Sequence, residues 1–140
     1  MAGSLTRFIE AQENTFAEAL EEIRNGRKES HWMWFIFPQL AGLGYSEMAR
    51  LYAIKDLDEA QRYLQDPVLG ERLIRISQVL AEIKGKTAHE IFGSPDDLKL
   101  KSSMTLFSLV PNAHSVFKQI LDHYFEGKKD ERTLSLLKES

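Results

Sequence analysis

The sequence contains no cysteine, which excludes disulfide bonds, thiolate nucleophiles and cysteine-bound metals. Its four histidines show none of the spacings typical of metal ligands, so we expect no bound metal ion. Glycine-rich nucleotide-binding loops and the nucleophile motif of serine hydrolases are also missing. The residues indicate no cofactor and leave the class of chemistry open.

The sequence also lacks long apolar runs and an excess of basic residues. Its longest uninterrupted apolar run, residues 32–37, is far shorter than the ~20 residues that a membrane helix needs. The formal net charge is -3, and the lysines and arginines are scattered along the chain. We therefore expect no membrane and no nucleic acid among its partners. Because the N-terminus lacks the apolar segment of a secretory signal, we expect a cytoplasmic protein.

Helix boundary signals recur along the chain, whereas strand signals do not. Apolar residues recur at three- and four-residue spacing in segments that begin at serine, threonine, aspartate or proline and often end at glycine. The expected helices cover residues 5–24, 46–54, 56–65, 67–84, 87–92, 94–110, 112–126 and 130–138. Without repeats or linkers, this pattern predicts one all-α domain, residues 1–140, of about seven to nine helices.

An aromatic block is the most unusual segment of the sequence. Between Ser30 and Gln39 lie both tryptophans and two of the eight phenylalanines. Each aromatic side chain buries roughly 150 to 250 Å². The block must therefore enter the core, line a pocket or dock a partner, and core packing is the favoured interpretation.

Four expected helices each carry a long polar residue inside an otherwise apolar face. These residues are Gln12, Glu47, Arg72 and Lys99. Burying such groups without partners is costly, so they must pair with one another, meet water or bind a ligand. If they meet in one hollow beside the aromatic block, they form a polar pocket of the kind that small ligands occupy.

The cations among these residues suit an anionic ligand. Arg72 and Lys99 would bind phosphate or carboxylate, and Asp96 and Ser103 share the helix side of Lys99. The alternative is purely structural: Asp96 with Lys99, and Glu47 with Arg72, would form internal ion pairs, or Lys99 and Arg72 would extend their charged ends outward into water.

Several segments resemble the bacterial family known as domain of unknown function 1810 (DUF1810). The segments are residues 30–39, 42–44, 66–70, 91–93 and 98–107. The likeness covers nearly the whole chain and implies a mainly helical protein of unknown function.

A shorter segment, Tyr45-Ser46-Glu47, is similar to a tyrosine, small hydroxyl and glutamate segment of the NADAR superfamily. These helical proteins are linked to NAD and ADP-ribose metabolism and include N-glycosidases that act on ribosyl phosphates. Met48 stands where that group often has histidine. The resemblance implies that Glu47 is a catalytic candidate.

The leading hypothesis is a protein that binds a small anionic metabolite, either a nucleotide or a ribosyl phosphate. Arg72 and Lys99 would contact the anion, and Trp32 or Trp34 would stack on a ring of the ligand. Tyr45 completes the expected ligand contacts, which also include Gln12, Asp96 and Ser103.

Whether the protein is an enzyme is left open by the sequence. Glu47 is the expected general acid or base for hydrolysis at a glycosidic carbon, and His31 is suited to proton transfer near neutral pH. One alternative is a protein-interaction module that uses residues 30–44. Another is a structural domain with internal ion pairs. The sequence does not fix the oligomeric state.

Overall fold

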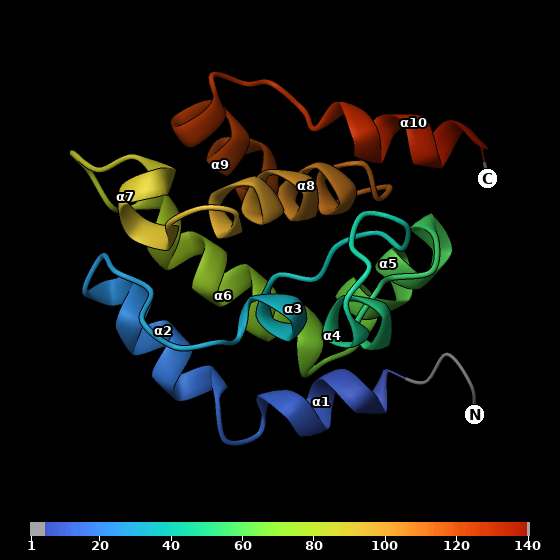
Figure 1. Cartoon of the computed structure of the whole chain (residues 1–140), viewed down its shortest axis with the longest axis horizontal. Helices are drawn as coiled ribbons and strands as arrows, with labels where there is room; N and C mark the ends of the chain where they lie inside the picture. The colour runs from blue at the N-terminus through green and yellow to red at the C-terminus, as the bar shows by residue number, and fades with distance from the viewer. Residues whose placement is uncertain (1–4, 140) are drawn as a thin grey trace.

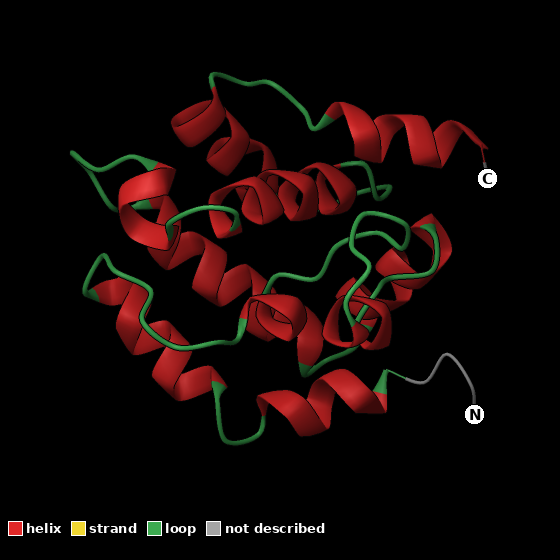
Figure 2. Cartoon of the chain, viewed as in Figure 1, coloured by secondary structure: helices red, strands yellow, loops and turns green. Residues whose placement is uncertain are grey.

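The computed structural model describes residues 5–139, and these residues form ten α-helices around one core (Figures 1 and 2). The helices are α1 (Thr6–Gln12), α2 (Phe16–Arg24), α3 (Met33–Ile36), α4 (Glu47–Leu51), α5 (Leu57–Gln65), α6 (Leu69–Ala81), α7 (Ala88–Phe92), α8 (Asp96–Ser108), α9 (Val116–Phe125) and α10 (Glu131–Glu139). The only extended pairing among the described residues is an isolated bridge between Leu40 and Ile54. The predicted all-α class is confirmed.

Three predicted helix starts are confirmed by their capping hydrogen bonds. The side chains of Ser46 and Asp56 each accept a bond from the backbone N–H three residues on, at 3.1 and 2.8 Å. Thr87 and Glu90 form a complete capping box at the start of α7. Local capping chemistry therefore determines where α4, α5 and α7 begin.

The predicted helix over residues 5–24 is wrong, because the chain breaks between α1 and α2. Asn14 and Thr15 favour non-helical backbone, since their side chains compete with the helix for backbone hydrogen bonds. The break lets α1 pack on α3 while α2 packs on α6. It also follows directly on Gln12, whose side chain is almost fully buried.

The aromatic block forms the short helix α3 and enters the core, as the favoured interpretation predicted. Trp32 and Phe37 are fully buried, and their rings pack 6.5 and 6.0 Å from the ring of Phe92 on α7. Phe35 is also buried, whereas Trp34 is only partly buried. Most of the block is therefore unavailable as a docking surface for a partner.

Helix α8 is the centre of the arrangement. It packs against α5, α7, α9 and α10, and Figure 1 shows it running through the middle of the molecule. Leu100, Met104, Leu106 and Phe107 on its wide apolar face are all fully buried. No helix among the described residues is long and apolar enough to cross a membrane.

Candidate functional site

A groove of about 440 Å³ lies between the loop that precedes α4, the start of α8 and the start of α10. This volume is within the range of about 300–1,000 Å³ that is usual for small-molecule sites. Its lining combines rings, small apolar groups and polar side chains. The lining residues are Trp34, Gln39, Leu43, Gly44, Tyr45, Ser46, Ala49, Pro95, Leu98, Lys99, Ser102, Asp130 and Arg132.

Lys99 supplies a positive charge to this groove from the first turns of α8. Its ammonium nitrogen lies 5.3 Å from the centre of the Trp34 ring and 3.5 Å from Oδ1 of Asp96. The other oxygen of Asp96 is 2.9 Å from the nearly buried ammonium of Lys28. One carboxylate is thus shared by two ammonium groups, so the cluster carries a net positive charge. The predicted Asp96–Lys99 pair is confirmed.

Gln39 directs an amide group into the groove from the end of the aromatic block. Its Oε1 accepts a hydrogen bond of 2.6 Å from the hydroxyl of Ser102. The same hydroxyl also lies 3.0 Å from the carbonyl oxygen of Lys99. The Nε2 group has no hydrogen-bond partner among the described residues, so it is available to donate to a ligand.

Two charged residues of opposite sign enter the groove from the start of α10. Arg132 lies beside the loop, with one guanidinium nitrogen 3.4 Å from the carbonyl of Gly42. Asp130 is used internally, because one of its carboxylate oxygens accepts bonds from both the backbone N–H and the hydroxyl of Thr133, at 2.9 and 2.7 Å. The groove therefore holds two cationic side chains, Lys99 paired with Asp96 and Arg132 bonded to the Gly42 carbonyl, beside an engaged carboxylate.

The rim of the groove is apolar and exposed. Tyr45 is 73% exposed and Leu98 is 59% exposed, although both are large hydrophobic side chains. They lie on the loop before α4 and on α8, respectively, and both line the groove. A ligand or partner that binds here would cover exposed apolar surface and also contact the charged side chains of the groove.

The four polar residues, whose convergence the sequence left open, do not share one pocket. Gln12 and Arg72 meet in a separate cluster, where Gln12 donates to the Phe35 carbonyl at 2.7 Å and to the Tyr63 hydroxyl at 3.0 Å. Arg72 donates to Oε1 of Gln12 at 3.3 Å and lies 3.7 Å from Glu13. The cluster satisfies its members internally, and burial raises the pKa of the Tyr63 hydroxyl far above its usual range.

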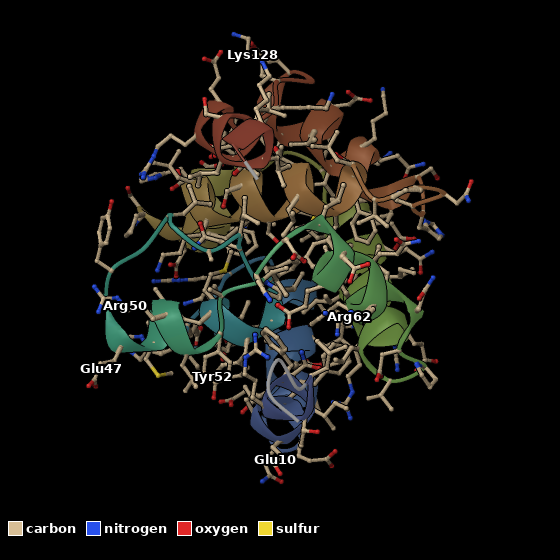
Figure 3. All side chains as sticks on the ribbon, turned by 90° about the vertical axis from the view of Figure 1, so that its right-hand side faces the viewer. Glu10, Glu47, Arg50, Tyr52, Arg62 and Lys128 are labelled. Atoms are coloured by element: carbon tan, nitrogen blue, oxygen red, sulfur yellow. The ribbon has the colours of Figure 1, made fainter. Side chains whose placement is uncertain are left out.

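Glu47 is remote from both the groove and Arg72. It is exposed on α4, and its side chain points away from the protein (Figure 3). It does not line the groove, and no ion pair joins it to Arg72 in the described part of the chain. The predicted Glu47–Arg72 pair is therefore wrong, because Arg72 is held by residues of α1 and the turn that follows it.

The remaining predicted site residues divide between groove, core and surface. Trp34 and Tyr45 line the groove as expected. Trp32 and Ser103 are fully buried, so neither is accessible to a ligand. His31 is exposed, outside the groove and without a hydrogen bond among the described residues.

Sequence reasoning missed Gln39, Ser102 and Arg132. Ser102 and Ser103 follow Lys99 by three and four residues, so both lie on its side of the helix. Spacing alone therefore could not show which of the two serines lines the groove. Gln39 ends the aromatic block, a position that local pattern rules do not interpret. Arg132 comes from a helix remote in the sequence, and no local signal places it here.

Glu22 on α2 is a buried polar residue that the sequence also did not reveal. Its carboxylate accepts hydrogen bonds from the Ser30 hydroxyl at 2.6 Å, the Trp32 indole N–H at 2.8 Å, and the backbone N–H groups of Glu29 and Ser30 at 2.8 and 3.0 Å. Burial alone would raise the pKa of Glu22, but these four bonds outweigh it and hold the pKa at about 2. They fix the segment that carries Lys28 beside the Asp96–Lys99 pair.

The described residues contain no group of three or more histidine, aspartate and glutamate side chains that could hold a metal ion. What the groove presents is a net positive polar interior, a partly buried indole and an exposed apolar rim.

Comparison with known proteins places this chain in a family. A family model described as "Protein of unknown function (DUF1810)" matches residues 2–137. The chain belongs to the DUF1810 family. Three of the DUF1810-like segments, residues 30–39, 42–44 and 98–107, contribute side chains or backbone to the groove.

The DUF1810 fold is also represented by a crystal structure. The conserved hypothetical protein Rv1873 from Mycobacterium tuberculosis is 48% identical to this chain, with 96% of each chain covered and a TM-score of 0.94. Comparison with functionally curated proteins finds no match. The likeness therefore supports the DUF1810 fold and leaves its chemistry to be argued from the groove.

Proposed function

We propose that the groove at the start of α8 binds a small anionic metabolite. The observation that carries the proposal is the position of Lys99, whose ammonium lies over the Trp34 ring in a groove with a net positive cluster at its wall. Arg132, on α10, supplies a second cation to the lining. Both cations suit phosphate or carboxylate, and the Gln39 amide adds a neutral donor.

The rings of the groove favour a ligand that carries a planar group. Trp34 is partly buried in the groove, and Tyr45 is exposed at its rim. Stacking on an aromatic side chain contributes about 1–3 kcal/mol for a nucleobase. Nucleotides are therefore the first ligand class to test, and ribosyl phosphates are the second.

The proposal is binding without hydrolysis. N-glycosidase-like hydrolysis needs a carboxylate that faces the ligand and is free to exchange a proton. Among the described residues that line the groove, Asp130 is the only acidic one, and it caps α10. Glu47 points into solvent, so no described carboxylate is placed for this chemistry.

A thermal-shift screen tests the proposal with adenosine monophosphate, ribose 5-phosphate and inorganic phosphate. A ligand present at 100 times its dissociation constant stabilises the native state by about 2.7 kcal/mol, which raises the melting temperature measurably. We expect adenosine monophosphate to stabilise the wild-type protein, and Lys99→Gln and Arg132→Gln each to reduce the shift. Lys118→Gln is the matched control, because Lys118 is exposed on α9.

Stabilisation that is equal in wild type, Lys99→Gln and Arg132→Gln would contradict the proposed site. Absence of any shift with all three ligands, at concentrations well above a millimolar dissociation constant, would contradict the ligand class. Added salt should weaken an interaction that depends on these partly exposed cations.

A second candidate function is docking of a protein partner on the groove rim. Tyr45, Leu51 and Leu98 are the large hydrophobic side chains most exposed among the described residues, and two of them line this groove. Sedimentation at increasing protein concentration tests whether the partner is a second copy. If it is, the wild type associates while a Tyr45→Ser/Leu98→Ser variant stays monomeric; a wild type that remains monomeric excludes this partner.

A further inference from the structure

Lys28 lies beside the ion pair at the start of α8 but outside the groove. Its ammonium nitrogen is 2.9 Å from Oδ2 of Asp96 and donates a hydrogen bond of 2.6 Å to the carbonyl of Ser30. Its side chain is only 7% exposed, and it is not among the residues that line the groove. Any effect of Lys28 on a bound ligand must therefore act through Asp96 and Lys99.

Lys28 and Lys99 compete unequally for the carboxylate of Asp96. The ammonium of Lys28 is 2.9 Å from one oxygen, whereas that of Lys99 is 3.5 Å from the other. Charge-assisted hydrogen bonds of this kind are about 2.7–2.9 Å long, so only the distance to Lys28 is that short. An ammonium group withdrawn from water also depends more on its counter-charge than one that water still reaches. Asp96 is therefore held mainly by Lys28.

Lys99 keeps its hydrogen-bond donors available as a result. An ammonium group has three N–H donors, and the 3.5 Å separation from Asp96 is long for a hydrogen bond. The Lys99 ammonium lies inside the groove, 5.3 Å from the centre of the Trp34 ring. An anion in the groove would thus meet a cation whose charge Asp96 only partly offsets.

The position of Lys28 is fixed by contacts that do not involve the groove. Its backbone N–H donates a hydrogen bond of 2.7 Å to the carbonyl of Ile91 on α7. Its ammonium lies 5.1 Å from the centre of the Trp32 ring, and the indole N–H of Trp32 donates to Glu22 at 2.8 Å. Neither Ile91, Trp32 nor Glu22 lines the groove. A ligand can therefore enter the groove without disturbing what holds Lys28.

We propose that Lys28 is a positioning residue of the anion site, an inference that rests on the proposed function. By holding Asp96, it keeps that carboxylate from neutralising Lys99. Two ammonium groups and one carboxylate give the cluster a net charge of +1, whereas Asp96 and Lys99 alone would be neutral. Asp96, which the sequence placed among the ligand contacts, opposes anion binding in this arrangement, because its charge repels the anion.

Calorimetric titration of the full chain with adenosine monophosphate tests the proposal on a series of cluster charges. The net charge is zero in Lys28→Met, +1 in the wild type and in Lys28→Met/Asp96→Asn, and +2 in Asp96→Asn. We expect Lys28→Met to bind about fivefold more weakly than the wild type, the double variant to bind like the wild type, and Asp96→Asn to bind more tightly. Added salt should reduce these differences.

The rescue by Asp96→Asn separates charge from structure. Loss of a second native contact could not repair a fold damaged by Lys28→Met, whereas it does restore the net charge. Asp96→Asn keeps Lys28 and nearly the same side-chain volume, so it tests the charge argument by itself. Lys86→Met is the matched control and should bind like the wild type, because Lys86 holds the nearby Gly26 carbonyl at 3.0 Å and lies outside the groove.

Urea unfolding without ligand tests the competition for Asp96. In the wild type Asp96 is held mainly by Lys28, so Lys99→Gln should change the urea midpoint little. In the Lys28→Met background Lys99 is the remaining cation beside Asp96, so the same substitution should lower the midpoint further. An effect of Lys99→Gln that is equal in both backgrounds would overturn the inference.

The binding results distinguish failure of this inference from failure of the proposed function. Wild-type binding that a folded Lys28→Met variant leaves unchanged would overturn the inference alone, as would a double variant without rescue or an Asp96→Asn variant that binds no more tightly than the wild type. No binding by the wild type, or equal binding by Lys99→Gln, would overturn the proposed function and this inference with it.

Discussion

The Glu22 carboxylate determines how the segment between α2 and α3 is held. Four donors converge on its two oxygens, including the indole N–H of the fully buried Trp32. A hydrogen bond to a charged group contributes more to stability when it is buried than when it is exposed to water. The same segment carries Lys28, which shares Asp96 with Lys99.

Glu22→Gln should destabilise the protein by on the order of 3 kcal/mol, because the amide replaces one acceptor oxygen by a donor among four converging donors. Glu21→Gln, at the exposed neighbouring position, should change the free energy of unfolding by less than about 0.5 kcal/mol. Urea unfolding at neutral pH measures both. A Glu22→Gln variant as stable as wild type would contradict the role of this carboxylate.

The depressed pKa of Glu22 also predicts how stability responds to acid. The ordinary pKa of a glutamate is near 4.5, and that of Glu22 is about 2. At pH values between these two, Glu22 is ionised in the native state and protonated in the unfolded state. The stability contributed by Glu22 is therefore fully present above pH 4.5 and is lost as the pH falls toward 2. Urea unfolding between pH 5 and 3 should show a shallower loss for Glu22→Gln than for wild type; equal slopes would contradict this.

At the residue scale, sequence reasoning identified the groups that cannot be buried alone but not their partners. Lys99 with Asp96 was predictable, because the two are three residues apart on one helix. The contacts of Gln12 with Tyr63 and Arg72 were not predictable, because they join residues more than fifty positions apart. Helical periodicity gives the buried face of each helix and carries no information on which helix lies opposite.

At the scale of elements, one glycine determines how closely α5 and α6 approach. Gly70 on α6 is buried, and a Cβ atom placed there would lie 2.1 Å from the backbone oxygen of Leu64 on α5. The backbone of α5 cannot yield to such a contact without separating the two helices. The absence of a side chain at Gly70 therefore sets the α5–α6 packing.

Gly70→Ala should destabilise the fold by about 2–4 kcal/mol, since it overpacks a contact between two backbones. Glu71→Ala is the control, because Glu71 is the next residue on α6 and is exposed. Thermal unfolding of both variants measures the difference. If the Gly70→Ala variant has the same melting temperature as the wild type, α5 and α6 are less tightly fixed than the contact implies.

The starts of α4, α5 and α7 were predictable because capping is local, whereas two features were not. The break after Gln12 depends on α1 and α2 finding different neighbours, α3 and α6, which no local pattern specifies. The aromatic block became the short helix α3 because its rings pack against Phe92 and Tyr52 from remote segments.

At the scale of the whole molecule, the central helix α8 supports the groove that Lys99 and Arg132 line, the cationic groove. Because α8 packs on four other helices, the cationic groove takes Leu98, Lys99 and Ser102 from a firmly held element, as precise binding sites require. The loop before α4 and the start of α10 complete the cationic groove, and only the tertiary structure brings them together.

The central claim is that Lys99 makes the cationic groove an anion site, and calorimetric titration with adenosine monophosphate tests it most directly. The account predicts saturable binding to the wild type, and binding to Lys99→Gln weaker by at least about tenfold, or about 1.4 kcal/mol, at the same ionic strength. Circular dichroism confirms that the variant is folded. Equal affinities of wild type and a folded Lys99→Gln variant, or no heat of binding to the wild type, would contradict it.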